Sequence, residues 1–567
     1  MAAPKNIRSL GRQHRHTRFY TDPRRTRAGS PLQIENLTTF LSTSRRIHDL
    51  PIIEKLAYAV HAASNAEVLL VRLLPAEPGE GPHEWSPLNT VPYDRFAFAN
   101  QLQTIADGVK RLFMRVGSEA GDRRYVTAVL GHCTRFFKHV LVHAESDAGR
   151  GPVTECIRRA RMAYALVAQD VDSFVRYREY NAWLTHNEKA RRAYLKPVLC
   201  LGSEEMPQTR EDLRPALGTT VHLYLRDCPR EDHATRNRLD SEWAGGLHFD
   251  LRRWAREIAR CRIGLALSSG GAKGFAHIGV IQVLEEHGIE VDMIAGSSMG
   301  AYVGSLWAAG HDARFIRDKA MELQGRWGWW KLLDPVLFPR RGFITGNKIR
   351  KLLMQSIGDA QFCDLVRPLK VVTTNLETLE REVFDAGEVA AAVQASAAIP
   401  GVCSPVKIAG EYYVDGGVVD PLPVRLLREE GIERIIAVNT MPTPDLMRRA
   451  RELEHIRTRR LKARPWWRRF LDRQFNYCAT GNIIDIIQQS FTGAQIPNSE
   501  DACRNADVVI RPINLDGSWH DFHRPRKYIA LGRRTALAQL PELKALTRPM
   551  EKDHEHETPL YPMATAA

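Results

Sequence analysis

The chain has 567 residues, 44% of them hydrophobic and 26% charged, so it can build several domains with buried cores, and wholesale disorder is excluded. Its nine cysteines include no Cys-x-x-Cys pair, which excludes a disulfide scaffold and a zinc ribbon and indicates reduced thiols in the cytoplasm. No apolar run of the length of a membrane span is found, and no signal peptide is expected.

The net charge of +14 is concentrated in two segments. Residues 1–30 carry a net charge of +7 and are expected to form a disordered basic tail, with a transit peptide as the alternative. Residues 448–473 carry +8 and include paired tryptophans, which suits peripheral contact with a membrane surface; the alternative is a solvated helix. Because the remainder is close to neutral, no nucleic-acid partner is expected.

The first part of the chain shows mainly helical patterns and no catalytic motif. Residues 31–200 are therefore expected to form a mainly helical domain of unknown role, with one helix opening at residues 50–57 and another over 95–116. Five prolines mark residues 75–95 as a loop or linker. Residues 201–260 are expected to form a lead-in segment, after a short strand at 198–201 and with another at 221–225.

From residue 263 onward, short apolar strands alternate with helices, which indicates an α/β fold with a mainly parallel sheet. The core of this domain is expected to span 261–440, followed by a basic Trp-containing insertion at 441–480, a C-terminal completion at 481–545 and a flexible tail at 546–567. The expected strands are 263–267, 291–294, 369–374, 412–414, 435–438 and 507–510, and the expected helices are 275–287, 299–309 and 526–540.

A Gly-x-Ser-x-Gly motif occupies residues 296–300, between an expected strand and an expected helix. A serine on such a tight turn projects its hydroxyl group, and flanking Gly296 and Gly300 let the turn form without side-chain collision. The helix that follows presents unpaired N–H groups to a developing anion. Ser298 is therefore a candidate nucleophile, and an ordinary turn is the alternative.

A glycine-rich turn, Ser-Gly-Gly-Ala-Lys-Gly, follows the first strand of this domain at residues 269–274. Consecutive backbone N–H groups in such a turn can bind an anion, so an oxyanion hole and a nucleotide phosphate cradle both fit. The spacing does not match a Walker A motif and matches the dinucleotide fingerprint only weakly. A plain tight turn is the third reading.

A third motif, Asp415 followed by two glycines, lies just past an expected strand. Alone it would be an ordinary turn. Together, the three motifs lie at strand ends of one sheet and would supply a nucleophile, a base and an oxyanion hole.

These three motifs, in this order, resemble the patatin-like phospholipases, and residues 274–280 and 397–401 add to the likeness. Within that family, residues 506–512 with Trp519, Asp521 and Phe522 resemble the neuropathy target esterase branch and its bacterial relatives. The likeness covers residues 250–540. The resemblance implies a three-layer α/β sandwich with a mainly parallel central sheet, preceded in the chain by the mainly helical N-terminal domain.

The resemblance implies a Ser-Asp dyad without a catalytic histidine, metal or cofactor, in which Ser298 is the nucleophile and Asp415 the base. It also implies a hydrolase that releases fatty acid from a phospholipid or lysophospholipid through an acyl-enzyme, placed in the cytoplasm or peripherally on the inner membrane face. His277 is expected to have a packing role. The oxyanion-hole candidates are Gly270, Gly271 and Ala272, and the supporting motif residues are Ser269, Lys273, Gly274, Gly296, Gly300, Gly416 and Gly417.

One departure from the family pattern is Ser269, where a glycine is usual. A side chain here could be incompatible with the backbone angles of the turn. The alternative function is therefore a weak or inactive patatin-like protein that serves as a nucleotide- or lipid-binding regulatory module.

Overall fold

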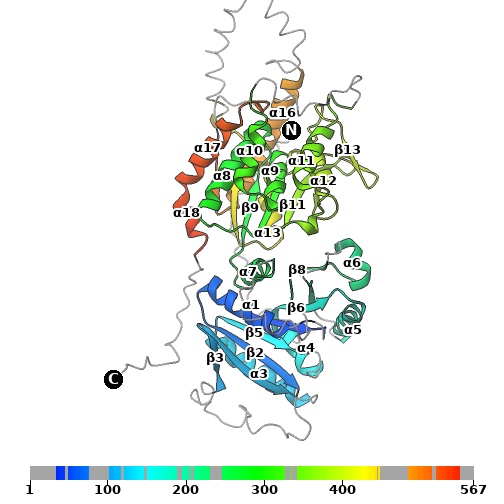
Figure 1. The fold of residues 1–567 in the computed structure, drawn as a ribbon, viewed down its shortest axis with the longest axis vertical. Coiled ribbons are helices and arrows are strands. Elements are labelled where there is room, and N and C mark those ends of the chain that lie inside the picture. Colours follow the sequence, from blue (N-terminus) through cyan, green and yellow to red (C-terminus); the bar gives the residue numbers. More distant parts are fainter. Residues whose placement is uncertain are drawn as a thin grey trace, which may run out of the picture.

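The computed structural model describes residues 33–44, 47, 49–75, 101–116, 120–145, 150–187, 195–202, 205, 210–229, 246–325, 334, 341–443, 445, 446, 448, 483–513 and 519–548. Two eight-stranded sheets organise this part of the chain, one above the other in Figure 1. The predicted N-terminal tail, the predicted C-terminal tail from residue 549 onward, the proline-rich linker from residue 76 onward and nearly all of the basic insertion lie outside the described residues.

The first sheet is built from residues 34–225 and has the strand order β3-β4-β2-β5-β1-β6-β7-β8. All of its pairings are parallel except that between β3 and β4. Its strands are β1 (Ile34–Ser42), β2 (Val68–Pro75), β3 (Gln103–Ala106), β4 (Val109–Val116), β5 (His139–Ala144), β6 (Ala160–Ala168), β7 (Leu195–Cys200) and β8 (Leu223–Leu225).

Helices cover both faces of this first sheet, and its central strands are buried on both sides. One face packs against α3 (Ala120–Phe136), α4 (Arg150–Arg159), α5 (Val171–Asn187) and α6 (Arg210–Leu217). The other packs against α1 (Asp49–Ser64) and α7 (Gly246–Ile258). Helix α7 lies between the two sheets in Figure 1, and its Arg256 forms an ion pair of 2.7 Å with Asp292 of the second domain.

The prediction of a mainly helical N-terminal domain is therefore incomplete, because its helices surround a sheet. The helix expected at residue 50 is present as α1, whereas the helix expected over 95–116 is wrong, because the described part forms the strands β3 and β4. Along β4, burial alternates with a period of two from Leu112 to Val116, which is the pattern of a strand. The expected lead-in segment contains β8, which pairs with β7 in the first sheet.

The second sheet has the strand order β13-β14-β11-β10-β9-β15-β16, and β12 pairs with β11. Strands β11, β10, β9, β15 and β16 are parallel, while β12, β13 and β14 add antiparallel pairs at one side. The strands are β9 (Ile263–Leu267), β10 (Met293–Ser297), β11 (Leu369–Asn375), β12 (Arg381–Phe384), β13 (Val406–Ile408), β14 (Glu411–Asp415), β15 (Arg434–Val438) and β16 (Val508–Ile510).

Helices on both faces of the second sheet give the predicted three-layer sandwich. One layer contains α8 (Ala276–Glu286), α9 (Met299–Ala308), α10 (Ala313–Met321), α11 (Asn347–Ile357), α12 (Val389–Ser396), α17 (Pro525–Ala538) and α18 (Leu540–Ala545). The other contains α13 (Val424–Glu429) and the end of α16 (Ile483–Arg504). Short 3-10 helices are η2 (Gly271–Phe275), η4 (Phe362–Asp364) and η5 (Gly416–Val418). The fold class predicted for this half of the chain is confirmed.

Candidate active site

Ser298 occupies the tight turn between β10 and α9, in a strained backbone conformation with φ 54° and ψ −119°. The neighbouring glycines make this turn sterically feasible. A Cβ atom on Gly296 would lie 2.6 Å from the amide nitrogen of Ala301, and one on Gly300 would lie 2.2 Å from the carbonyl oxygen of Leu267. The turn thus holds the hydroxyl group of Ser298 at the carboxyl edge of the sheet, as the sequence motif predicts.

Asp415 ends strand β14 and lies in hydrogen-bonding contact with this serine. The Oγ of Ser298 donates to Oδ2 of Asp415 at 2.6 Å, and the amide of Gly417 donates to Oδ1 at 2.7 Å. Both side chains are almost fully buried, at 5% and 1% exposure. Burial raises the pKa of Asp415 from 3.8 to about 6, although both hydrogen bonds oppose the change by stabilising the carboxylate.

Ser396, at the end of α12, fixes the backbone of the nucleophile. Its Oγ accepts a hydrogen bond of 2.9 Å from the amide of Ser298 and donates one of 2.6 Å to the carbonyl oxygen of Val372 in β11. The side chain is completely buried. Ser396 was not predicted from the sequence, because no local sequence pattern links this serine to a turn 98 residues earlier.

The glycine-rich turn after β9 lies beside the dyad. Ser269 does not adopt a positive φ angle; the positive φ angles of the turn are those of Gly270 and Gly271. The amide of Ser269 donates to the carbonyl oxygen of Pro421 at 2.9 Å, so this serine is accommodated without strain. The concern that a side chain here would disable the turn is therefore not supported by the backbone.

Of the three candidate oxyanion donors, Gly270 and Gly271 line the same small pocket as Ser298. The amide of Ala272 instead donates to the carbonyl oxygen of Trp519 at 2.8 Å, and Ala272 is not among the residues that line the pocket. A Cβ atom on Gly271 would lie 2.6 Å from that same carbonyl oxygen, so the loop packs tightly against the segment that contains Trp519.

Lys273 also lines this pocket and is half-buried. Burial lowers the pKa of its ammonium group, and the negative charge of Asp521 partly opposes that change. In its charged form the lysine would add positive potential to the pocket that it shares with Ser298, where negative charge would develop during attack on a carbonyl group.

Two further motif glycines are required by close packing. A Cβ atom on Gly274 would lie 2.4 Å from Cγ of Met299, and one on Gly416 would lie 2.1 Å from the carbonyl oxygen of Val372. These contacts bring η2 against the start of α9 and set the position of η5 behind the dyad. Both glycines thus support the site through the backbone.

His277 has a structural environment, as expected. It is fully buried, its Nε2 donates to the carbonyl oxygen of Ser268 at 2.9 Å, and burial lowers its pKa to about 4. His277 lies on α8, and its neutral imidazole thus links this helix to Ser268, just before the glycine-rich turn. Among the described residues, no group of three or more His, Cys, Asp or Glu side chains could hold a metal ion.

The pocket around the dyad is small, at about 30 Å³. It is closed by residues of the glycine-rich turn, the Ser298 turn, the end of β14, the loop after β15 and helix α16, together with Ile399 and Trp519. The lining residues are Ser269, Gly270, Gly271, Lys273, Ser298, Ile399, Asp415, Met441, Pro442, Phe491, Thr492, Gln495 and Trp519.

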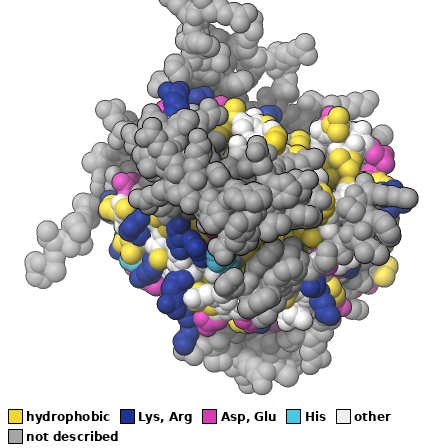
Figure 2. All heavy atoms as spheres, turned by 90° about the horizontal axis from the view of Figure 1, so that it is seen from above, with side chains coloured by type: hydrophobic (Ala, Val, Ile, Leu, Met, Phe, Trp, Pro, Cys, Tyr) yellow, Lys and Arg dark blue, Asp and Glu magenta, His cyan; other side chains and the backbone are white. Residues whose placement is uncertain are grey.

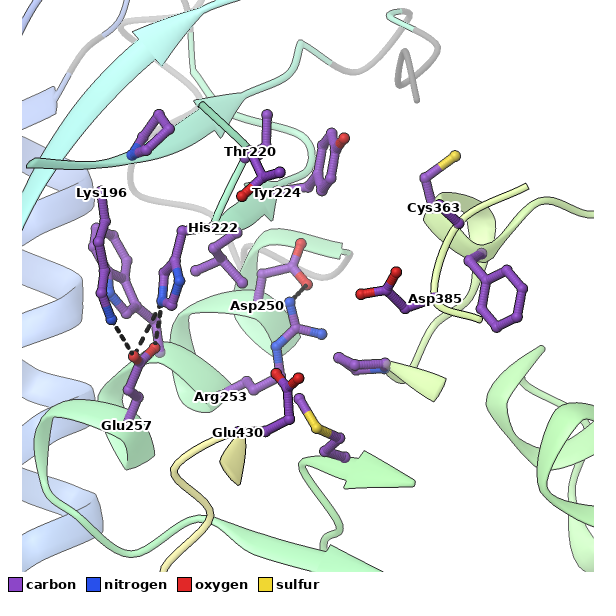
Figure 3. Close-up of a pocket in the computed structure, with 18 of the residues that line it drawn as sticks. Lys196, Thr220, His222, Tyr224, Asp250, Arg253, Glu257, Cys363, Asp385 and Glu430 are labelled. Atoms are coloured by element: carbon purple, nitrogen blue, oxygen red, sulfur yellow. Dashed lines mark hydrogen bonds and ion pairs between the residues drawn. The ribbon is translucent and has the colours of Figure 1, made fainter. Parts of the chain in front are cut away.

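A larger cavity of about 600 Å³ lies between the two sheets (Figure 3), but it is separate from the dyad. It borders Met293 and Leu369, at the amino ends of β10 and β11, whereas Ser298 follows the carboxyl end of β10. Its buried Glu257 accepts a hydrogen bond of 3.0 Å from His222, with Lys196 at 3.6 Å. The hydrogen-bonded pair of Ser298 and Asp415 lies in the smaller pocket instead.

Comparison with known proteins agrees with this geometry. Residues 265–428 match the family model described as Patatin-like phospholipase. This stretch of the chain is therefore similar to the patatin-like phospholipases. The match spans β9 to α13 and so contains Ser298, Asp415 and the glycine-rich turn.

Curated relatives share part of this domain. Over 197 residues the chain is 34% identical to lysophospholipase NTE1 of Cryptococcus neoformans var. neoformans and to lysophospholipase NTE1 of Saccharomyces cerevisiae, covering 35% of this chain and 12% of each relative. The chain thus spans about one eighth of the length of these relatives. Among solved structures, VipD of Legionella pneumophila is 18% identical over 50% of this chain and 67% of its own, with a TM-score of 0.28, which carries no further argument.

Proposed function

We propose that this protein is a serine esterase of the lipid acyl hydrolase type, with Ser298 as nucleophile and Asp415 as base. The observation that carries the proposal is the 2.6 Å hydrogen bond from Ser298 Oγ to a buried Asp415 carboxylate, on a strained strand-to-helix turn. A pKa of about 6 leaves Asp415 ionised at neutral pH and makes it a stronger base than an exposed carboxylate.

The mechanism follows from these groups. Ser298 Oγ attacks the ester carbonyl carbon while its proton passes to Asp415, and the oxyanion binds the amides of Gly270 and Gly271 beside Lys273. Collapse of the tetrahedral intermediate breaks the ester bond, and the leaving alcohol takes the proton from Asp415. Water then attacks the acyl-enzyme and loses a proton to Asp415; Ser298 regains that proton as the fatty acid leaves.

Phospholipid or lysophospholipid is the proposed substrate class. The names of the fungal relatives, lysophospholipases, support this choice. Assignment to bacterial relatives of the neuropathy target esterase branch stays a prediction, as do a cytoplasmic location and membrane contact through residues 448–473. Among the helices of the described residues, none has both the length and the apolar character to cross a membrane.

Covalent labelling with a fluorophosphonate tests the proposal, with p-nitrophenyl butyrate turnover beside it. Wild-type protein is expected to be labelled and active, and Ser298→Ala to lose both. A Ser298→Ala protein that is labelled like wild type would assign the nucleophile elsewhere. A folded wild-type protein without labelling or turnover, but stabilised by nucleotide, would favour the binding-module alternative.

A further inference from the structure

Helix α16 covers the nucleophile. Its residues Phe491, Thr492 and Gln495 line the pocket around Ser298, which has a volume of only about 30 Å³. That is room for about one water molecule, whereas pockets that enclose drug-sized ligands have volumes of about 300–1,000 Å³. A fatty acyl chain can therefore reach Ser298 only after part of the cover moves.

The two halves of α16 differ in how they are held. The second half is anchored: Gln495 and Ser499 are buried, Gln495 donates to the carbonyl oxygen of Gly417 at 2.9 Å, and Cys503 packs into the core of the sheet. The first half is largely exposed, with Ile486 at 55% and Ile487 at 37% exposure.

A weak point separates these halves. Pro497 lies inside the helix and has no amide hydrogen, so the carbonyl group of Gly493 lacks its helical partner. Gly493 itself disfavours the helix, and a Cβ atom there would meet nothing within 4 Å. The helix can therefore bend between Gly493 and Pro497 while its second half stays in the core.

Other exposed apolar side chains belong to the same carboxyl edge of the sheet. Leu376 and Leu379, at 39% and 71% exposure, form the turn that follows β11. The amide of Leu376 bonds the carbonyl oxygen of Tyr412, and the Tyr412 hydroxyl group accepts a hydrogen bond of 3.2 Å from Arg341. Leucines beside a tyrosine and an arginine are typical of surfaces at the lipid–water boundary.

This rim is continuous with α16. Ile487 lies next to Gly401, where a Cβ atom would be 3.4 Å from Cδ1 of Ile487, and the carbonyl oxygen of Val402 accepts from the amide of Phe343. The chain then leads directly to Arg341. Figure 1 places α16 and β13 at the end of the molecule away from the first sheet, and Figure 2 looks onto that end, where hydrophobic and basic side chains appear among the described atoms.

We propose that the first half of α16, residues 483–494, is a cover that binds a lipid surface through Ile486 and Ile487 and bends away from Ser298 there. The inference rests on the proposed function and deepens it. A lipid surface would bury the two isoleucines and draw the cover off the pocket, with the rim of Leu376, Leu379 and Tyr412 as a second contact. The enzyme would thus act on aggregated rather than dispersed lipid.

The test compares wild type, an Ile486→Ser/Ile487→Ser double variant and a matched control, Val171→Ser/Val175→Ser. The control removes two exposed apolar side chains from α5 of the first domain, at 74% and 47% exposure. Binding to phosphatidylcholine vesicles is measured by co-sedimentation, and turnover of lysophosphatidylcholine is measured below and above its micelle concentration. Vesicles with and without anionic lipid separate binding by α16 from binding by the basic residues 448–473.

Wild type and control are expected to bind neutral vesicles and to increase turnover at least about tenfold once lipid aggregates form. The isoleucine variant is expected to bind about 10- to 100-fold more weakly, because its two apolar side chains are lost, and to show an aggregate-to-monomer turnover ratio near one. Binding that depends only on anionic lipid, or equal binding by all three proteins, would overturn the proposal. So would self-association through these isoleucines without vesicle binding.

A second variant tests the cover without lipid. Phe491→Ala shortens a side chain that closes the pocket, so fluorophosphonate labelling of Ser298 in lipid-free buffer should become at least about threefold faster. Unchanged or slower labelling of this variant would contradict a covering role. Vesicle binding is measured independently of turnover. If wild-type protein binds neutral vesicles but is neither labelled nor active, the proposed esterase function is refuted and the proposed lipid-binding surface is supported.

Discussion

Replacement of Asp415 by asparagine should remove activity and stabilise the catalytic domain. The carboxylate is almost fully buried and its pKa is raised from 3.8 to about 6, which corresponds to a cost of about 3 kcal/mol for holding it ionised. Asparagine has the same shape, can donate to Ser298 Oγ and can accept from the amide of Gly417. It therefore keeps the packing and avoids the buried charge.

The stabilisation by Asp415→Asn should depend on pH, because only the wild-type carboxyl group titrates. Below pH 4 the carboxyl group is protonated in both folded and unfolded wild type, so the variant has no advantage. Between about pH 4 and 6 the unfolded chain ionises first, and wild type loses stability as the pH rises. The gain of the variant should therefore grow across this window and level off at about 3 kcal/mol above pH 7.

Native-state hydrogen exchange of amides in β10 and β14 would measure this gain for the catalytic sheet itself. Ser298→Ala is the control, since it removes activity but keeps the buried carboxylate. Wild-type kcat/KM should fall tenfold per pH unit below about pH 6, and Asp415→Asn should lower it by about 10²–10⁴-fold. No stabilisation at pH 8, or a wild-type rate that is flat from about pH 5 to 8, would refute this reasoning.

Three further substitutions test the site and its framework. Ser396→Ala leaves the buried Ser298 amide without its partner, so chemical denaturation should show a loss of about 1–3 kcal/mol in the free energy of unfolding. Labelling of Ser298 should also slow about tenfold, and unchanged labelling would contradict the positioning role of Ser396. Gly300→Ala should prevent stable folding of the catalytic sheet, whereas Gly131→Ala, at an open helical position, should be neutral or stabilising by up to about 1 kcal/mol in thermal unfolding. Burial would raise the pKa of Glu257, but its basic neighbours lower that pKa overall. Glu257→Gln should therefore lower the free energy of unfolding by about 3 kcal/mol at neutral pH and by less in acid, and a loss that does not depend on pH would contradict this.

Six of the eight strands of the second sheet could be predicted because each is a short apolar run bounded by turn residues, whereas β12 and β13 were not predicted. β9 was predicted at its observed bounds, and β10, β11, β14, β15 and β16 within about three residues. In the first sheet, only β7 and β8 correspond to predicted strands, at 198–201 and 221–225. β2 is an apolar segment interrupted only by Arg72, and its pattern does not distinguish a buried strand from a buried helix, so only its pairing with β4 and β5 decides the question.

The motifs predicted the tight turn at Ser298, because such a turn requires glycine where a side chain would collide with the backbone, and this requirement is visible in the local sequence. Thus Ser298, Gly296 and Gly300 were predicted with the correct geometry. Contacts between distant segments leave no such marks. The sequence could not reveal that Ser396 holds the nucleophile, that the Trp519 carbonyl takes the amide of Ala272, or that α16 closes the pocket.

By itself, the sequence determined the order of motifs along the second sheet and hence the pairing of a serine with an aspartate. Local sterics specify the turn of Ser298, whereas Asp415, at the end of the antiparallel strand β14, was specified by its place among the three motifs and by their resemblance to a known family. Only the tertiary structure decided which groups surround that pair and how far they are shielded from water. The pKa of Asp415 and the size of the pocket both depend on burial by segments far apart in the chain, and burial is a property of packing rather than of local sequence.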